Sequence, residues 1–393
     1  MTNPNSFNKS FILEAKNLTL LISALSKRGY TVIGPKVRDS AIVFDEIISL
    51  TDLPIGYSEV QNGGAYRLDK KNHERLFDYV VGPQSVKKYL FPSFQKLWGA
   101  NKSKDGFNTN DADEKRPKLA LLGIRPCELA AIEIQDKIFS DGPYKDPHYN
   151  KARKQTLIMA VNCANPGGTC FCESMGTGPK AISGYDLALT EIYEGGKHWF
   201  LINVGSNSGS EIAQEIKLRQ ANDSEKKAAE ETMAQSSKKM GRSLNTANVK
   251  ELLYRNFDNP IWEKIADRCL TCGNCTMVCP TCFCSSAEDT SNLPNTQAER
   301  WRKWDTCFSV DYSYIHGGSI RQTARARYRQ WMMHKLSYWV DQFGVSGCVG
   351  CGRCITWCPV GIDITEEARA IRESELAKAK TTVISYETVG KES

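Results

Sequence analysis

The chain has 393 residues, about two to three times the usual length of one domain, which predicts two or three domains with buried cores. Lys and Arg number 51 against 45 for Asp and Glu, an excess too small and diffuse to indicate nucleic-acid binding by itself. The first ten residues lack the basic start and apolar core of a signal peptide, and no apolar run approaches the ~20 residues that span a bilayer. We therefore expect a cytoplasmic protein with no membrane span, whose 15 cysteines indicate metal or redox chemistry rather than disulfides.

The first half of the chain alternates segments typical of strands and helices. Residues 127–139 have helical spacing, and Pro126 suits the first turn of a helix. A hairpin with its turn at residues 194–197 is expected further on. A mixed α/β domain over about residues 10–205 follows from this pattern. The expected strands are short β-branched or aliphatic runs at residues 30–35, 41–47, 118–123 and 156–162.

The second half of the chain has a different composition. Residues 211–239 are rich in Lys, Glu, Ala and Gln and predict an exposed helix, so that 206–247 would form a helix and linker. From residue 248 strand signals vanish, which favours a mostly helical domain over 248–370. Residues 371–393 would form a C-terminal tail. The fold class expected from the whole pattern is α+β.

Two cysteine motifs in the second half share one spacing. CLTCGNCTMVCP and CVGCGRCITWCP both follow C-x2-C-x2-C-x3-C-P. This is the pattern of bacterial two-cluster ferredoxins, in which three thiolates bind one [4Fe-4S] cluster and the fourth binds the other cluster. The second domain is therefore predicted to be a helical two-[4Fe-4S] ferredoxin-like domain; paired zinc ribbons, the alternative, would lack the third cysteine and the trailing Cys-Pro. The predicted ligands are Cys269, Cys272, Cys275 and Cys358 for one cluster and Cys348, Cys351, Cys354 and Cys279 for the other.

The 68 residues between Cys279 and Cys348 exceed what a compact ferredoxin needs, and we expect helices to fill this gap. Cys282, Cys284 and Cys307 lie within it. These three cysteines could complete a further site, replace an expected ligand, or pack beside the clusters as small apolar side chains.

A basic run in the same gap is interleaved with Tyr328 and Trp331. It could form a solvated face, balance the negative charge of the clusters or face an acidic partner, and a nucleic-acid helix is the less favoured interpretation. For His316 and His334, packing or hydrogen bonding outweighs metal ligation. The basic residues are Arg321, Arg325, Arg327, Arg329 and Lys335.

Four more cysteines lie in the first half. Cys127 and Cys163 each follow a predicted strand, and Cys170 and Cys172 come shortly afterwards in a glycine-rich stretch. Because strand ends converge at one edge of an α/β sheet, these four thiols predict a third [4Fe-4S] cluster. The alternatives are unrelated core cysteines or a redox pair of Cys170 and Cys172, although a C-x-C disulfide is strained.

The order of GIRPCELAAIEIQDKIF, CFCESMGTGP, CPTCFC, WDTC and CVGCGRC resembles the β subunits of cytosolic NADP-linked [NiFe] hydrogenases of the sulfhydrogenase type. The A subunit of anaerobic sulfite reductase has a similar layout. The resemblance covers about residues 28–365, except for insertion-like stretches near 100–115 and 205–245. It extends to the cysteines at positions 127, 163, 170, 172, 284 and 307.

This resemblance implies a subunit that relays single electrons within an oxidoreductase complex. FAD and NAD(P) would be bound only by a partner flavoprotein, and the other partners would be [NiFe] hydrogenase small and large subunits or a sirohaem sulfite reductase subunit. The chain has no G-x-G-x-x-G after a strand, no G-x4-G-K-[ST], no H-E-x-x-H and no G-x-S-x-G. We therefore expect no catalytic residues, no nucleic-acid partner and a non-catalytic role; a zinc-bearing nucleic-acid-binding protein is the alternative from another class.

Overall fold

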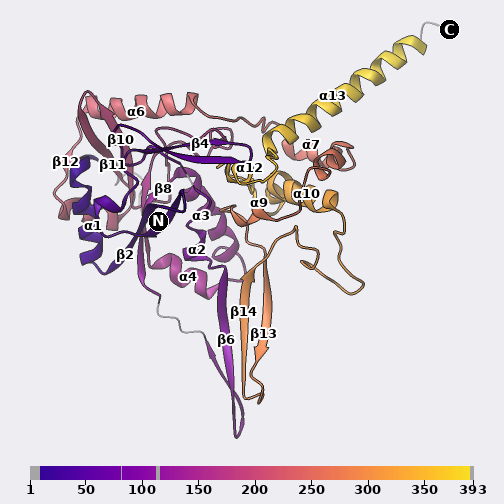
Figure 1. The fold of residues 1–393 in the computed structure, drawn as a ribbon, viewed down its shortest axis with the longest axis horizontal. Helices are drawn as coiled ribbons and strands as arrows, with labels where there is room; N and C mark the ends of the chain where they lie inside the picture. The colour runs from indigo at the N-terminus through magenta and orange to yellow at the C-terminus, as the bar shows by residue number, and fades with distance from the viewer. Residues whose placement is uncertain (1–8, 81, 112–115, 390–393) are drawn as a thin grey trace.

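The structure is a computed structural model that describes residues 9–80, 82–111 and 116–389. The sequence of residues 1–8 predicts no signal peptide, and these residues lie outside the described part of the structure. Residues 390–393 of the expected C-terminal tail also lie outside it. The expected tail begins inside a long helix, α13 (Ile364–Val389), which extends away from the body of the molecule (Figure 1). None of the described helices is both long and apolar enough to cross a membrane.

An eight-stranded sheet organises the first half of the chain, in the order β12-β1-β11-β10-β9-β8-β2-β3 (Figure 1). Its four inner strands β2, β8, β9 and β10 run parallel, and antiparallel strands extend it on both sides. All four strands expected from the sequence are confirmed, as is the turn between Glu194 and Lys197. The strands are β1 (Ser10–Glu14), β2 (Tyr30–Arg38), β3 (Ala41–Glu46), β8 (Lys118–Ile124), β9 (Thr156–Val161), β10 (Leu187–Glu194), β11 (Lys197–Val204) and β12 (Arg219–Gln220).

Helices cover both faces of this sheet, which is why its inner strands are continuous apolar runs. Successive residues of one strand enter opposite cores: Leu122 packs with α1 (Leu18–Lys27) and α5 (Asn207–Glu215), whereas Leu121 packs with α3 (Pro126–Phe139) and α4 (Pro147–Lys154). The predicted helix α3 is confirmed, and Pro126 occupies its first turn. This arrangement fixes the start of α3 at the carboxyl end of β8.

The exposed helix expected over residues 211–239 is present only in part of that segment. The segment contains the end of α5, the short strand β12, and α6 (Asp223–Lys238), and Lys217 adopts a left-handed backbone conformation between the first two. Asn222 and Glu225 form a capping box that starts α6. Ala229 of α6 is buried against the sheet and Met233 is also buried, so one face of this largely exposed helix covers part of the fold.

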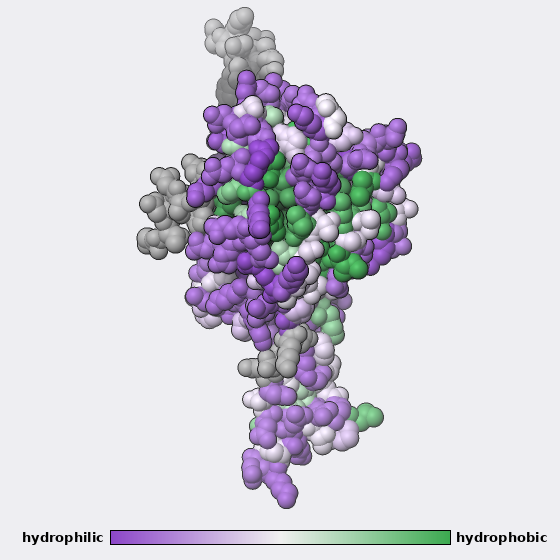
Figure 2. Space-filling view, turned by 90° about the vertical axis from the view of Figure 1, so that its left-hand side faces the viewer, coloured by the Kyte–Doolittle hydropathy of each residue, from purple (hydrophilic) through white to green (hydrophobic). Residues whose placement is uncertain are grey.

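The expectation that strands are absent after residue 248 is also wrong. β13 (Ser285–Ser291) and β14 (Gln297–Trp304) form a hairpin, and β14 pairs with β6 (Phe94–Ser103), which pairs with β7 (Gly106–Asp111). The resulting arm extends away from the body (Figures 1 and 2). Its polar side chains are partly exposed on both faces, so no alternation of apolar and polar residues marks the strands in the sequence. A smaller hairpin joins β4 (Tyr57–Asn62) and β5 (Ala65–Lys70).

Short helices surround one further core in the second half, which confirms a mostly helical arrangement within an α+β fold. Trp262, Trp331, Leu336 and Ile355 are among its buried residues. The helix that carries Trp331 continues through one π-helical turn at His334–Tyr338. The domain boundaries expected from the sequence stay a prediction. The remaining helices are α2 (Lys87–Leu90), α7 (Val249–Arg255), α8 (Ile261–Ala266), α9 (Asn274–Met277), α10 (Ala324–Met333), α11 (Trp339–Phe343) and α12 (Arg353–Thr356).

A buried ion pair joins the helical region to the sheet region. Arg353 of α12 is 1 % exposed and Glu128 of α3 is 0 % exposed. The guanidinium group of Arg353 also donates to the carbonyl oxygens of Gly82 and Gln84, at 2.8 and 3.3 Å. The Glu128 carboxylate accepts a hydrogen bond from the backbone N–H of Val86 at 3.1 Å. The two charges are therefore held in a network that spans both regions.

We expect Glu128→Gln to lower the free energy of unfolding by about 3–5 kcal/mol, because it leaves the buried guanidinium group of Arg353 without its counter-charge. The midpoint of urea unfolding measures this change. Asp289→Asn is the control, since its pair with Arg300 is exposed to solvent and should contribute little to stability. Equal midpoint shifts for the two variants would contradict the importance we give to the buried pair.

Candidate iron–sulfur sites

The two C-terminal motifs fold into matching loops. Gly273 precedes α9 and Gly352 precedes α12, both with left-handed φ angles of 77° and 75°. This conformation, which glycine adopts without strain, turns the chain so that the third cysteine of each motif lies on the short helix. Each loop also places a backbone N–H group close to the sulfur atom of its first cysteine. Thr271 N lies 3.4 Å from Cys269 Sγ, and Gly350 N lies 3.5 Å from Cys348 Sγ. Such donors favour a thiolate in a cluster ligand.

One narrow cavity collects the cysteines predicted for the first cluster. It brings a cysteine of the second motif beside three of the first, as the exchange of ligands between ferredoxin motifs requires. Phe308, Tyr328 and Trp331 form other parts of its wall, and Cys354 also reaches it. The predicted ligands among its lining residues are Cys269, Cys272, Cys275 and Cys358.

The second predicted set gathers next to this cavity. The thiol of Cys354 lies within electrostatic range of Cys348, Cys351 and Cys279, and burial is the largest cause of its raised pKa. Burial likewise raises the pKa of Cys348 to about 12. Thiols in such surroundings keep their protons until a cation replaces them, and metal binding supplies that cation. The placement fits the predicted exchange of Cys279 and Cys358 between the two motifs.

Cys279 is the exception among these thiols. A hydrogen bond from the Cys282 thiol, together with the Lys335 ammonium group, holds the pKa of Cys279 well below its usual range. The hydroxyl of Thr281 lies 3.2 Å from Cys279 Sγ. These contacts favour the thiolate form of Cys279, and the Cys282 thiol can donate a hydrogen bond to it.

Two buried lysines add positive charge beside this loop. Lys335 lies on the π-helical turn and donates to Thr281 Oγ1 at 2.6 Å; burial opposes its charge, but the sulfur atoms of Cys279 and Cys282 outweigh burial and raise its pKa. Lys87 donates to the carbonyl oxygens of Cys279 and Cys282 at 3.1 and 2.9 Å. Neither lysine pairs with a carboxylate among the described residues, so an anionic group bound by the nearby cysteines would balance their charge.

The other two cysteines of the gap lie nearby. Cys307 is buried, and burial raises its pKa to about 12, with Cys284 the next cause. The hydroxyl of Tyr312 is hydrogen-bonded to Cys284. Neither cysteine lines the cavity of the first cluster. Their part in a further site stays a prediction.

All four cysteines of the first half line one enclosed cavity. They come from the first turn of α3, the end of β9 and the following loop, and each is between 5 and 7 % exposed. Burial raises the pKa of Cys172 to about 12. The Arg125 side chain is part of the same wall, and its hydrogen bonds go to the backbone carbonyls of Phe77, Tyr79 and Asn162. The convergence expected from the strand ends is therefore observed, and the four are Cys127, Cys163, Cys170 and Cys172.

This N-terminal cavity adjoins the second C-terminal motif. The amide N–H of Phe171 donates to the carbonyl oxygen of Gly350 at 2.8 Å, and Cys170 Sγ lies 3.8 Å from the carbonyl oxygen of Cys351. The hydroxyl of Thr177 donates to Val349 O at 2.6 Å. The three cysteine groups therefore form one continuous row.

The residues present fit [4Fe-4S] clusters in three respects. The sulfur atoms gather in fours, backbone N–H groups lie close to several of them, and buried cations lie beside them. Furthermore, the hydroxyl of Tyr328 and the indole N–H of Trp331 are buried and without a hydrogen-bond partner among the described residues. No group of three or more His, Cys, Asp or Glu side chains in the described part of the chain is placed to hold a single metal ion.

The basic run does not form a uniform charged face. Arg325 and Arg329 pair with Asp258, and the guanidinium group of Arg327 donates to the carbonyl oxygen of Phe308 at 2.9 Å. Burial lowers the pKa of His334 to about 4, so it packs as a neutral ring. These contacts support a structural role for the run.

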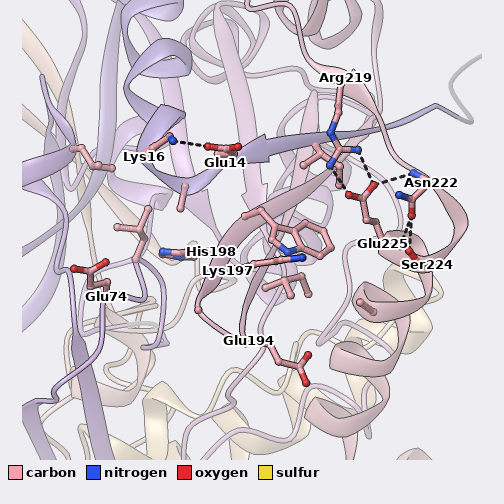
Figure 3. Close-up of a pocket in the computed structure, with 18 of the residues that line it drawn as sticks. Glu14, Lys16, Glu74, Glu194, Lys197, His198, Arg219, Asn222, Ser224 and Glu225 are labelled. Atoms are coloured by element: carbon pink, nitrogen blue, oxygen red, sulfur yellow. Dashed lines mark hydrogen bonds and ion pairs between the residues drawn. The ribbon is translucent and has the colours of Figure 1, made fainter.

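A much larger cavity of about 940 Å³ lies elsewhere, between β1, the β10–β11 turn and the start of α6 (Figure 3). Several of its charged side chains contact one another: Lys16 lies 2.9 Å from Glu14, and Arg219 pairs with Glu225. Figure 2 shows this side of the molecule, where hydrophobic residues lie between hydrophilic ones. No cysteine lines the cavity, so it is separate from the row of cysteine sites.

Comparisons with known proteins agree with iron–sulfur sites at the two C-terminal cysteine motifs. The family described as a 4Fe-4S dicluster domain matches residues 268–362, which include both C-terminal motifs. The sulfhydrogenase 2 subunit beta of Pyrococcus furiosus is 31% identical to the chain over 322 residues. The match covers 81% of this chain and 92% of that protein.

The two loops offer a matched test of local strain. Thr271 has a left-handed φ of 52° where the other loop has Gly350, so Thr271→Gly should raise the free energy of unfolding by up to about 1 kcal/mol without loss of iron. In the reverse variant, Gly350→Thr, the new Cβ would lie 2.6 Å from Phe171 O. We expect that variant to lose stability and iron, as measured by urea unfolding and iron analysis. Similar behaviour of the two variants would contradict the close packing of the Gly350 loop.

Proposed function

The chain belongs to the family of the sulfhydrogenase beta subunits, and from this premise we propose a specific relay role for it. It passes single electrons through [4Fe-4S] clusters between an NAD(P)H-linked FAD subunit and a [NiFe] hydrogenase module. The observation that carries the proposal is the continuous row of three cysteine groups, which extends from the sheet to the exposed side of the helical region.

The ligands we propose follow the same row. Each bound [4Fe-4S] cluster would accept and release one electron at a time. The loops around Gly350 and Gly352 hold two of the sites side by side, since their backbone contacts the Cys170 loop directly. The sets are Cys127, Cys163, Cys170 and Cys172; then Cys348, Cys351, Cys354 and Cys279; then Cys269, Cys272, Cys275 and Cys358.

The two ends of the row differ in exposure. At the N-terminal end all four cysteines are buried, whereas Cys272 at the other end is exposed. Leu270 beside it is 60 % exposed, and Met277 and Val360 are also exposed apolar residues. An exposed cluster ligand among apolar side chains suits electron exchange with a docked protein. We propose this surface, defined by Leu270, Cys272, Met277 and Val360, as the electron port.

The native complex tests the assignment of partners. We expect it to contain nickel and FAD and to reduce NADP with hydrogen. A complex without nickel, but with sirohaem absorption in the partner, would favour the relay subunit of a sulfite reductase instead.

Within that complex, Cys170→Ser should remove or convert the N-terminal cluster, because a serine hydroxyl is a poorer iron ligand than a thiolate. Iron analysis should show a loss of up to four iron atoms per chain. Hydrogen-dependent NADP reduction should fall at least tenfold. Ala164→Ser, which introduces the same hydroxyl beside Cys163, is the control and should keep its iron. Unchanged iron in Cys170→Ser would refute this ligand assignment.

Leu270→Glu tests the electron port. The added charge should slow electron exchange with the docked partner about tenfold or more while the iron content stays the same, as followed by stopped-flow reduction of the clusters. Ile48→Glu places the same charge on a residue that is 78 % exposed and away from the cysteines, and should have no effect. Equal rates of cluster reduction in the two variants would show that the partner does not dock at this surface.

A further inference from the structure

Two aromatic residues of α10 line the cavity of the exposed cluster site opposite its cysteine loop. Tyr328 and Trp331 lie one turn apart, so their side chains share a face of the helix. They are 3 and 4 % exposed, and their rings lie 5.4 Å apart. Phe308 contacts both rings, which fixes their positions against the cavity.

Each of these side chains carries a polar hydrogen with no acceptor in the described part of the chain. The Tyr328 hydroxyl and the Trp331 indole N–H are both buried and unpaired. Buried donors nearly always have a partner in native proteins, because leaving them unpaired loses the hydrogen bonds that water would make. A group in the cavity therefore has to accept them.

Sulfur atoms are the acceptors that the cavity provides. Cys269, Cys272, Cys275 and Cys358 line it with the two aromatic side chains. The charged groups close to the Tyr328 hydroxyl, apart from the cysteine thiols, include the Glu367 carboxylate and the Arg268 guanidinium group. That carboxylate already pairs with Arg268. The geometry leaves the thiolates, and the sulfides of a bound cluster, as partners.

We propose that Tyr328 O–H and Trp331 N–H donate hydrogen bonds to the sulfur atoms of the cluster held by the Cys269 loop and thereby raise its reduction potential. Reduction adds a negative charge to the cluster, so its sulfur atoms accept hydrogen bonds more strongly afterwards and the donors stabilise the reduced form more. The two residues would make the cluster at the electron port a better electron acceptor. This inference rests on the proposed function, because it requires the cluster to be present.

The test uses Tyr328→Phe and Trp331→Phe in the purified complex. Both variants keep an aromatic ring: Tyr328→Phe removes only the hydroxyl donor, and Trp331→Phe removes the indole donor and also reduces the ring size. We expect each to lower the equilibrium constant for one-electron reduction about tenfold, which equals about 59 mV, in a redox titration followed by electron paramagnetic resonance. Iron content should not change. The affected signal should be the one that Cys269→Ser alters.

Tyr149→Phe is the matched control. Tyr149 is a fully buried tyrosine whose hydroxyl donates to Asp136 at 2.7 Å in the sheet region, so its loss should reduce stability and leave every potential unchanged. If Cys269→Ser alters a signal but neither aromatic variant shifts its potential, the inference is overturned and the proposed function stands. If Cys269→Ser changes neither iron content nor any signal, the proposed cluster and the inference both fail.

Discussion

The buried pair of Arg353 and Glu128 constrains the whole arrangement of cysteines. Arg353 lies between Cys351 and Cys354, and Glu128 follows Cys127, so one ion pair connects the ligand loops of two predicted clusters. An apolar pair of the same volume would often be equally stable or more stable, so stability alone does not explain a buried ion pair. Its directional contacts instead hold the two loops at a fixed separation. A fixed separation matters for electron transfer between neighbouring clusters, because the metal sites are positioned only through these loops.

The polypeptide also collects positive charge around the row of cysteines. Arg125 donates to backbone carbonyls and lies within electrostatic range of Glu59, whereas Lys87 and Lys335 contact carbonyls, a hydroxyl and thiols. Burying a cation without a counter-charge is costly. Thiolates and the anionic clusters they bind would supply that charge, so binding of the clusters and folding of this region would be coupled. The same cations favour addition of an electron to a neighbouring cluster, which links stability of the fold to redox function.

The sequence predicted those parts of the molecule that depend on local spacing. The inner strands, α3 and the two cysteine loops were recognisable because apolar runs, a first-turn proline and C-x2-C steps are short-range signals. The β13–β14 hairpin was missed because its strands are polar on both faces and are held by pairing with a distant strand. Lys87 was missed because a lysine buried by tertiary contacts looks like any surface lysine in the sequence. Tyr328 and Trp331 seemed to interrupt a charged face, and only the packing of α10 shows that they line a cavity.

The asymmetry between the two ends of the row has a consequence for how the relay would be controlled. At the N-terminal end the thiols are enclosed by protein, so the surroundings of that site change little when a partner binds. At the other end Cys272 and Leu270 are exposed, and a docked protein would exclude water from them. Solvent exposure is one of the factors that set a cluster's potential, whereas buried donors such as Tyr328 and Trp331 act in the free and docked states alike. Docking would therefore change the reduction potential only of the cluster at the exposed end. The internal donors would keep that potential high enough for the cluster to accept an electron.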